Sequence, residues 1–419
     1  MKKKTLKNGV RVITVPQKNT KVATVLVLVK AGSKNEEKSI SGISHFLEHM
    51  FFKGTKERKT PLAVAEELDK IGGVYNAFTG EDYTGYYAKV NSSFGSLAAE
   101  WVADIYLNST LPAVEVEKEK GVIKEEINMY YDNPMDYCQF VLQNLLYGDQ
   151  PAGWDIAGTK ESVTGITRED LLGYREHHYI AENTVVVVVG DIKKEMEERV
   201  EDLFSLVKPG TAKTKQPVVE KQDVGAVRCH YRETDQTHLC FGARAFNIFH
   251  ENRYPQELLA SMLGGMMSSR LFVKIREEMG LAYYVASGVD SNPDTGVLLT
   301  RVGVGNNKVE ATVQAVFKEY ERIKNEKVSG EELRKTKDYL KGKASIYLEA
   351  SNALASFYGL KELLEQRTYT LEEVFEKIEE VTADDIQQVA QEVFREDRMN
   401  IALVGPYKKE EELKKLIRL

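Results

Sequence analysis

A helix–strand unit near the middle of the chain recurs at its C-terminal end. The segment Ile166–Leu172 leads through a predicted helix to Asn183 and the strand Val185–Val189. The segment Val381–Ile386 leads through a second one to Arg398 and the strand Ile401–Val404. The two stretches keep the same spacing without a gap. Two unrelated units would not be expected to match over so long a stretch, so the pattern indicates an internal duplication.

A segment with the composition of a linker separates the two copies. Residues 208–222 are rich in Lys, Thr, Pro and Gln and lack apolar periodicity. A chain of 419 residues is long enough for more than one domain. We therefore predict a first domain over residues 1–207 and a duplicated second domain over residues 223–419.

Blocks of strands and helices follow one another within each half. The predicted strands of the first half, which include runs with period-two alternation, are Val10–Val15, Val22–Val29 and residues 74–90. Its predicted helices include Pro61–Ile71, Phe94–Asn108 and Val114–Tyr131. This order predicts an α+β fold made of two duplicated α/β sandwich domains, with helices packed on one face of each sheet.

Two histidines stand four residues apart in His45-Phe46-Leu47-Glu48-His49. On a helix, positions i and i+4 share a face, so both imidazoles can point at one metal ion. A zinc ion held by two histidines and a later carboxylate keeps a position for water and lowers the pKa of that water to roughly 7. Glu48 is placed to accept the proton of that water. The order H-x-x-E-H, the reverse of H-E-x-x-H, is the inverzincin signature.

An ordinary helix with two surface or core histidines is the alternative explanation of this motif. Its neighbours are apolar nearly all round the helix and predict burial: Ile43, Phe46, Leu47, Met50, Phe51 and Phe52. Two buried histidines and a glutamate without a partner would be costly. A metal ion removes that cost, so we favour a site for one Zn²⁺ per chain.

A third ligand is expected on the helix over residues 114–131. One continuous stripe of this helix contains its apolar residues and consists of Glu119, Val122, Ile123, Glu126 and Tyr130. Glu126 is therefore the inward carboxylate, and Glu119 lies one layer away on the same side. The adjacent His177 and His178 would diverge by about 100° on a helix, so we predict surface or packing roles for them.

Composition excludes several other classes of function. The net charge of −7 and the scattered lysines leave no basic footprint for nucleic acid. The lysines after Met1 are not followed by the apolar run of a signal peptide, and the other apolar runs are too short to span a membrane. We expect a soluble cytoplasmic protein in which three irregularly spaced cysteines, Cys138, Cys229 and Cys240, are reduced bystanders.

The motifs resemble those of the pitrilysin/insulinase family of zinc peptidases, in particular its short members related to mitochondrial processing peptidase. The segment His45–His49 matches the inverted motif of that family. The resemblance implies that Glu126 is the third zinc ligand and that Glu119 orients a ligand from behind. It also implies that the strand containing Asn76, Ala77, Phe78 and Thr79 pairs with the backbone of the substrate.

The second half carries a further part of the resemblance. Arg276 and Tyr283 stand seven residues apart in a segment similar to one that reaches the active site in the family. The resemblance implies that the arginine anchors the substrate main chain and that the tyrosine donates to the developing oxyanion. Met266 departs from the family pattern, in which many relatives have a third glycine there, and affects no catalytic residue.

The resemblance implies that a chain of this length corresponds to half of the long single-chain relatives, whose clamshell needs four such domains. We therefore expect a homodimer in which Arg276 and Tyr283 of one chain complete the zinc site of the other. The implied activity is that of a zinc endopeptidase that hydrolyses unfolded peptides or peptide segments in an enclosed chamber, with Glu48 as general base. Two alternatives remain, a specific processing protease for leader or targeting peptides and a non-catalytic assembly subunit of the same fold.

Overall fold

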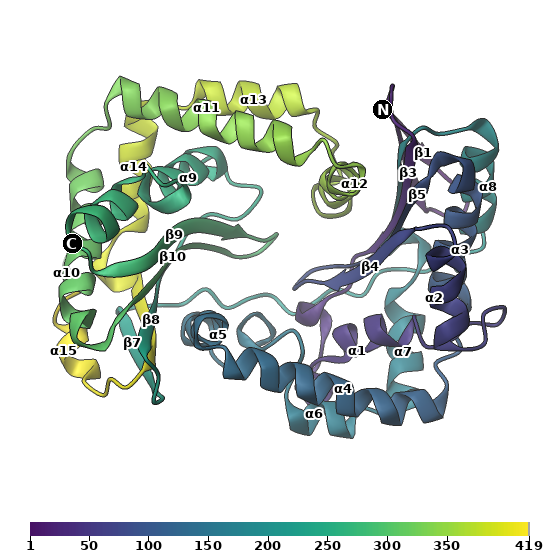
Figure 1. Ribbon diagram of the computed structural model, residues 1–419, viewed down its shortest axis with the longest axis horizontal. Coiled ribbons are helices and arrows are strands. Elements are labelled where there is room, and N and C mark those ends of the chain that lie inside the picture. The colour runs from purple at the N-terminus through teal and green to yellow at the C-terminus, as the bar shows by residue number, and fades with distance from the viewer. Residues whose placement is uncertain (418–419) are drawn as a thin grey trace. The chain divides into compact units, whose positions relative to one another are not determined.

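The computed structural model describes residues 1–417, which form two compact units (Figure 1). Unit 1 contains residues 1–127, 154–216 and 345–369, and unit 2 contains residues 128–153, 217–344 and the described residues from 370 onward. Each unit is built on one mixed sheet flanked by helices. The predicted α+β fold with two sandwich-like units is confirmed.

The sheet of unit 1 has six strands, and all neighbouring pairs are antiparallel except the parallel pair β2 and β6. Across the sheet the order is β1 (Lys2–Thr5), β2 (Arg11–Pro16), β6 (Thr184–Gly190), β3 (Val22–Val29), β5 (Thr84–Asn91) and β4 (Val74–Thr79). The predicted stretch 74–90 is thus two strands joined by a turn. Strand β4 lies at the edge, paired with β5 alone among the described strands.

The sheet of unit 2 repeats this plan with five strands. Their order is β7 (Ala226–Tyr231), β11 (Met399–Gly405), β8 (Gln236–Arg244), β10 (Gly296–Gly305) and β9 (Ala282–Ser291). The pair β7 and β11 is parallel and the others are antiparallel, as in the run β2-β6-β3-β5-β4 of unit 1. The two sheets therefore share one strand order and one pattern of directions, as a duplication predicts.

The helices agree closely with the predicted spans where the sequence identified them. In the chain up to residue 204 they are α1 (Ile43–Met50), α2 (Pro61–Asp69), α3 (Gly95–Asn108), α4 (Ala113–Asp132), α5 (Pro134–Tyr147), α6 (Lys160–Gly165), α7 (Arg168–His178) and α8 (Lys194–Phe204). Beyond it they are α9 (Arg253–Ala260), α10 (Val309–Asn325), α11 (Gly330–Tyr347), α12 (Ser351–Leu360), α13 (Leu371–Glu380), α14 (Ala383–Val393) and α15 (Glu410–Lys414). No helix within residues 1–417 is long and apolar enough to cross a membrane.

The repeated helices α7 and α14 begin in the same way. Thr167 and Thr382 each accept a hydrogen bond from the backbone of an aspartate three residues on, and that aspartate, Asp170 or Asp385, accepts one in return. This reciprocal capping box satisfies two N–H groups that a helix start leaves unpaired. The two copies of the repeated unit therefore share the same helix start.

Each unit takes one helix from the opposite half of the chain. Helix α12 packs on β3 and β6 in unit 1, and helix α5 packs on β8 and β11 in unit 2. The compact units thus differ from the halves 1–207 and 223–419, because each includes a segment from the other half. The expectation that helices cover only one face of each sheet is wrong, because the exchanged helix covers the second face.

The valine-rich strand β6 reflects this double cover. Val186 and Val188 point into the core beneath the helices of the first half, whereas Val185, Val187 and Val189 point into a second core with α12. Side chains of a strand alternate between the two faces, so a strand covered on both sides is apolar throughout. Cysteines 138 and 240 lie in the matching second core of unit 2, and all three cysteines are free thiols.

Helix α12 approaches its sheet so closely that a glycine is needed. A Cβ atom at Gly359 would lie 2.5 Å from Leu28 Cδ1 and 2.9 Å from Val187 Cγ2. We predict that Gly359→Val lowers the free energy of unfolding by about 1–3 kcal/mol, because the core is already filled. The control is Gly342→Val on α11, where an added Cβ meets nothing within 4 Å.

Urea unfolding followed by tryptophan fluorescence measures this difference, since Trp101 and Trp154 both belong to unit 1. Equal stability of the two variants would contradict close packing of α12 on the sheet.

Candidate metal centre

Helix α1 holds the H-x-x-E-H motif inside unit 1. Ile43, Phe46, Leu47 and Met50 are fully buried against the core, as their apolar pattern predicted. Gly42 precedes the helix with a φ of 92°, a conformation that favours glycine. The core side of α1 fixes the orientation of the helix, so its histidines face a defined direction.

His45, His49 and Glu126 come together around one point. The Nε2 atoms of the histidines are 3.2 Å apart, and Glu126 Oε2 lies 3.6 Å from that of His45 and 3.4 Å from that of His49. Within residues 1–417 this is the one group of three such side chains with ligand atoms inside 4.8 Å. Tetrahedral zinc ligands at about 2.0–2.2 Å from the ion stand about 3.3–3.6 Å apart, so these donors fit the ion closely. The structure places the three residues as predicted, and their role as ligands stays a prediction.

Two carboxylates favour positive charge between the histidine rings. Burial alone would lower the pKa of His49, but its hydrogen bonds to Glu119 and Glu126 raise that pKa to about 9. Burial and the charge on His49 lower the pKa of His45 to about 4, and the bond from His49 lowers the pKa of Glu126. The two carboxylates thus favour positive charge at this place, which a divalent cation would also supply.

Glu119 supports His49 from behind. Its Oε1 lies 2.9 Å from His49 Nδ1, its Oε2 lies 2.7 Å from Lys53 Nζ, and the residue is 3% exposed. Burial would raise the pKa of Glu119, but its bonds to His49 and Lys53 lower it. A carboxylate in this position fixes the ring so that Nε2 points at the metal. The sequence analysis missed Lys53, although its place four residues after His49 was a usable signal.

The helix that carries the candidate third ligand, Glu126, buries a narrower stripe of side chains than predicted. Val116, Glu119 and Ile123 of α4 are buried and Glu126 is partly buried. Val122 and Tyr130, which were expected on the same inward stripe, are 51% and 46% exposed. The prediction was wrong for these two because α4 is covered on one side only. The covered side contains Val116, Glu119, Ile123 and Glu126, and Val122 and Tyr130 lie outside it.

The candidate base Glu48 points toward the edge strand β4. Thr79, the last residue of β4, donates a hydrogen bond from Oγ1 to Glu48 Oε2. Burial raises the pKa of Glu48, while the bond from Thr79 lowers it. A carboxylate with a raised pKa is suited to accept a proton and to return it. Sequence reasoning proposed both residues separately and did not foresee that they touch.

Strand β4 presents an unpaired backbone edge among the described strands. The N–H of Gly80 bonds to the carbonyl of Tyr83, so by alternation Phe78 and Asn76 bond inward to β5 while Thr79 and Ala77 face outward. The outward N–H of Ala77 donates to the side chain of Asn76 at 2.9 Å. All four predicted substrate-strand residues therefore lie on an edge strand that touches the candidate base.

Arg276 and Tyr283 lie side by side in unit 2, and the metal ligands belong to unit 1. Arg276 is in the helical segment Phe272–Glu278, and its guanidinium carbon is 5.6 Å from the centre of the Tyr283 ring at the start of β9. Tyr283 is 75% exposed and available to another molecule. The structure brings this pair together, and its role in catalysis stays a prediction.

His177 and His178 do not join the metal cluster. His178 is 8% exposed and stacks on Tyr174, with ring centres 4.3 Å apart. His177 is exposed, and its Nδ1 lies 2.6 Å from the carbonyl oxygen of Gly173. Their packing and surface positions agree with the prediction.

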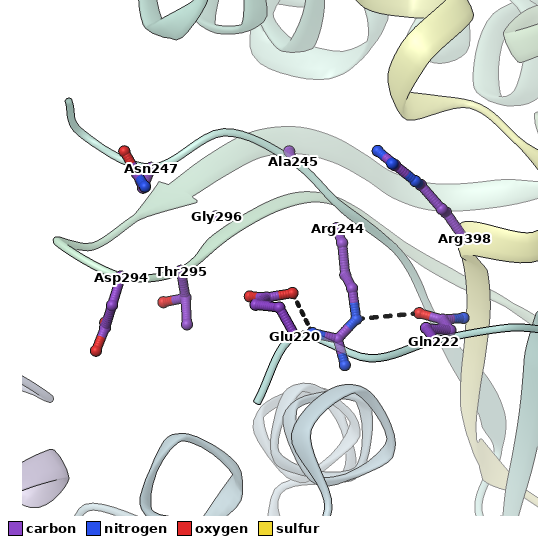
Figure 2. Close-up of a pocket in the computed structure, with 9 residues that line it drawn as sticks. All are labelled: Glu220, Gln222, Arg244, Ala245, Asn247, Asp294, Thr295, Gly296 and Arg398. Atoms are coloured by element: carbon purple, nitrogen blue, oxygen red, sulfur yellow. Dashed lines mark hydrogen bonds and ion pairs between the residues drawn. The ribbon is translucent and has the colours of Figure 1, made fainter. Parts of the chain in front are cut away.

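A cavity of about 310 Å³ in unit 2 is lined in part by residues of the segment that follows residue 216 (Figure 2). Figure 2 shows Arg244 of β8 reaching Glu220 and Gln222, and its Nε donates to Gln222 Oε1 at 3.2 Å. These bonds attach the segment after residue 216 to the sheet of unit 2. Arg244, Glu220 and Gln222 of the cavity thus hold this segment against the sheet.

Comparisons with known proteins agree with this arrangement. Residues 11–160 match the model of insulinase (peptidase family M16), and residues 165–340 match that of the peptidase M16 inactive domain. The uncharacterized zinc protease YmxG of Bacillus subtilis is 35% identical over 97% of this chain and 98% of its own length. A protease from Helicobacter pylori has a similar structure, with a TM-score of 0.90 and 27% identity over 97% of this chain and 99% of that one.

A structure of a peptidase M16 inactive domain from Pseudomonas fluorescens has the same fold, with a TM-score of 0.87 and 22% identity over 97% of this chain and 98% of that one. The candidate metal ligands lie within residues 11–160, the part that matches the insulinase model. The chain belongs to the pitrilysin/insulinase family of peptidases, family M16, and is of its short type.

Proposed function

We propose that this chain is a zinc-dependent endopeptidase that hydrolyses unfolded peptides or peptide segments. The observation that carries the proposal is the contact between the candidate base Glu48 and Thr79 at the end of an edge strand, directly beside the cluster of His45, His49 and Glu126. Membership of a peptidase family and the name zinc protease of its relatives support the same conclusion. The donor set fits one Zn²⁺ per chain.

The chain's own residues have distinct tasks in this reaction. His45, His49 and Glu126 would hold the zinc ion, which when bound polarises the scissile carbonyl and activates a water molecule. Glu48 takes the proton of the attacking water and later delivers it to the leaving amine. Thr79 holds the carboxylate of Glu48 in place through its hydroxyl.

Substrate would add to β4 as a further strand. The outward N–H and C=O groups of Thr79, Ala77 and Tyr75 are spaced to pair with an extended chain. A substrate carbonyl would replace the Asn76 side chain at the N–H of Ala77, where the protein now makes this bond itself. Because main-chain bonds supply much of the affinity, selectivity for sequence should be loose, and folded proteins should be poor substrates.

A non-catalytic assembly subunit is the rival, because residues 165–340 match a model described as inactive. The donor cluster and base lie outside that segment, in residues 45–126. Zinc content together with chelator-sensitive cleavage of a quenched peptide separates the two functions. Product mapping on a mixed peptide pool then distinguishes general peptide hydrolysis from processing of leader or targeting peptides.

Glu48→Gln tests the base directly. The amide cannot accept a proton, so we expect kcat to fall by roughly 10²–10⁴-fold while one zinc per chain is retained. Steady-state cleavage of a quenched peptide and metal analysis of the same sample measure both quantities. The matched control is Glu66→Gln on the exposed side of α2, and turnover retained by Glu48→Gln would remove Glu48 as base.

Glu119→Gln tests the support of His49. We expect zinc affinity to fall by about 10–100-fold, because the ring loses the carboxylate that orients it. Competition with a fluorescent zinc chelator measures the affinity. Glu117→Gln, an exposed position two residues away on the same helix, is the control. Equal affinities in the two variants would contradict the assigned role of Glu119.

We further propose a homodimer in which Arg276 and Tyr283 of one chain serve the zinc site of the other. Mixing the variants Glu48→Gln and Arg276→Ala, each inactive alone, should restore about a quarter of the wild-type rate. Half of the randomly mixed dimers carry both variants, and each of these has one complete site. Absence of any restored activity after verified subunit exchange would show that the pair does not act across chains.

A further inference from the structure

The loop over residues 32–36 is hydrogen-bonded to the turn that joins β4 to β5. The backbone N–H groups of Ser33 and Lys34 donate to the carbonyls of Gly80 and Glu81 at 3.2 and 2.8 Å. A Cβ atom at Gly32 would lie 2.3 Å from the carbonyl oxygen of Gly80, so the two backbones are in direct contact. The turn that follows Thr79 is therefore held by the loop through main-chain bonds.

The buried ammonium group of Lys34 adds ion pairs to these main-chain bonds. Lys34 is 2% exposed, and its Nζ lies 2.6 Å from Glu81 Oε2 and 3.4 Å from Asp82 Oδ2. Asp82 is 3% exposed and also pairs with Lys215. The ammonium groups of Lys34 and Lys215 are thus paired with the carboxylates of Glu81 and Asp82, as buried charges require. The only charge that the loop itself supplies to the turn is that of Lys34.

The other end of the loop holds the start of helix α1. Glu36 Oε2 accepts a hydrogen bond from the N–H of Gly42 at 2.7 Å, and Oε1 accepts one from the N–H of Ser44 at 2.8 Å. A carboxylate at this place satisfies N–H groups that the helix start leaves unpaired. Tyr174 adds a bridge, because its hydroxyl is 2.8 Å from Ser44 Oγ and 3.4 Å from the carbonyl of Gly32.

These contacts close a ring through the candidate active site. Helix α1 meets β4 through Glu48 and Thr79, and the loop joins the same two elements again one residue beyond Thr79 and just before His45. We propose that Lys34 is a positioning residue that, with Glu36 anchoring the loop to α1, sets the place of Thr79 against Glu48. This proposal rests on the proposed peptidase function.

The first experiment is a double-mutant cycle on zinc-loaded protein. Lys34→Met should lower kcat by about tenfold while zinc affinity stays within about twofold of wild type, because no metal ligand touches Lys34. In a Thr79→Val background the same change should lower kcat by less than about twofold, since the bond through which Lys34 acts is already absent. Lys38→Met, an exposed lysine in the same region, is the control and should match wild type.

Glu81→Gln provides a milder variant if Lys34→Met does not fold, because it removes the 2.6 Å ion pair from the more exposed partner. It should show the same loss of kcat and the same dependence on Thr79. Unchanged kcat in folded, zinc-loaded Lys34→Met or Glu81→Gln would overturn the proposal. A double variant of Lys34→Met and Thr79→Val whose fold-loss of kcat equals the product of the two single losses would overturn it as well.

Amide hydrogen exchange tests the same inference without any activity. In Lys34→Met the amides of residues 78–83 should exchange faster than in Lys38→Met, whereas those of α4 should be unchanged. Equal exchange of residues 78–83 in the two variants would overturn the positioning role. Failure of the wild-type protein to cleave peptides with zinc bound would instead end the proposed function, and the exchange result would still decide the role of Lys34 in placing the turn.

Discussion

Two imidazole nitrogens stand 3.2 Å apart and face the same carboxylate oxygen, and the surrounding structure of unit 1 keeps them there. The carboxylates around this group favour positive charge at its centre, which a divalent cation would supply. Helix α1 contributes both rings because its other sides are buried in the core. Helix α4 contributes Glu126, and Glu119 one layer behind it sets the direction of His49.

Helix α1 also connects the candidate metal cluster to the edge strand β4. Glu48 is next to His49 in sequence and touches Thr79 at the end of β4, so the candidate base and the candidate substrate strand meet within one contact. An edge strand is normally a liability because its unpaired groups attract other chains. Here the Asn76 side chain covers one of those groups, and the proposed function uses the edge for substrate.

The sequence was most informative where local patterns decide structure. The spacing of His45 and His49, the burial of α1 and the repeated helices α7 and α14 follow from local patterns, and the structure has them as expected. The edge strand was found from alternation, although its turn at Gly80 was not. The family and the fold follow from the same motifs.

Several features that depend on distant parts of the chain were not predicted. Helices α5 and α12 pack on sheets built largely from the other half, and no local pattern says which sheet an apolar helix will cover. The bond between Glu48 and Thr79 joins residues 31 positions apart, and the exposure of Val122 depends on how much of α4 its neighbours cover. No local pattern marks Lys34 as a buried lysine, because its partner Asp82 lies 48 positions away in the chain.

Anomalous X-ray diffraction at the zinc edge, on crystals of the full chain grown with Zn²⁺, tests the central claim most directly. The account predicts one strong anomalous peak per chain, at bonding distance from the Nε2 atoms of His45 and His49 and an oxygen of Glu126. A well-ordered site without a peak at that position, or a fully occupied zinc bound elsewhere, would contradict it.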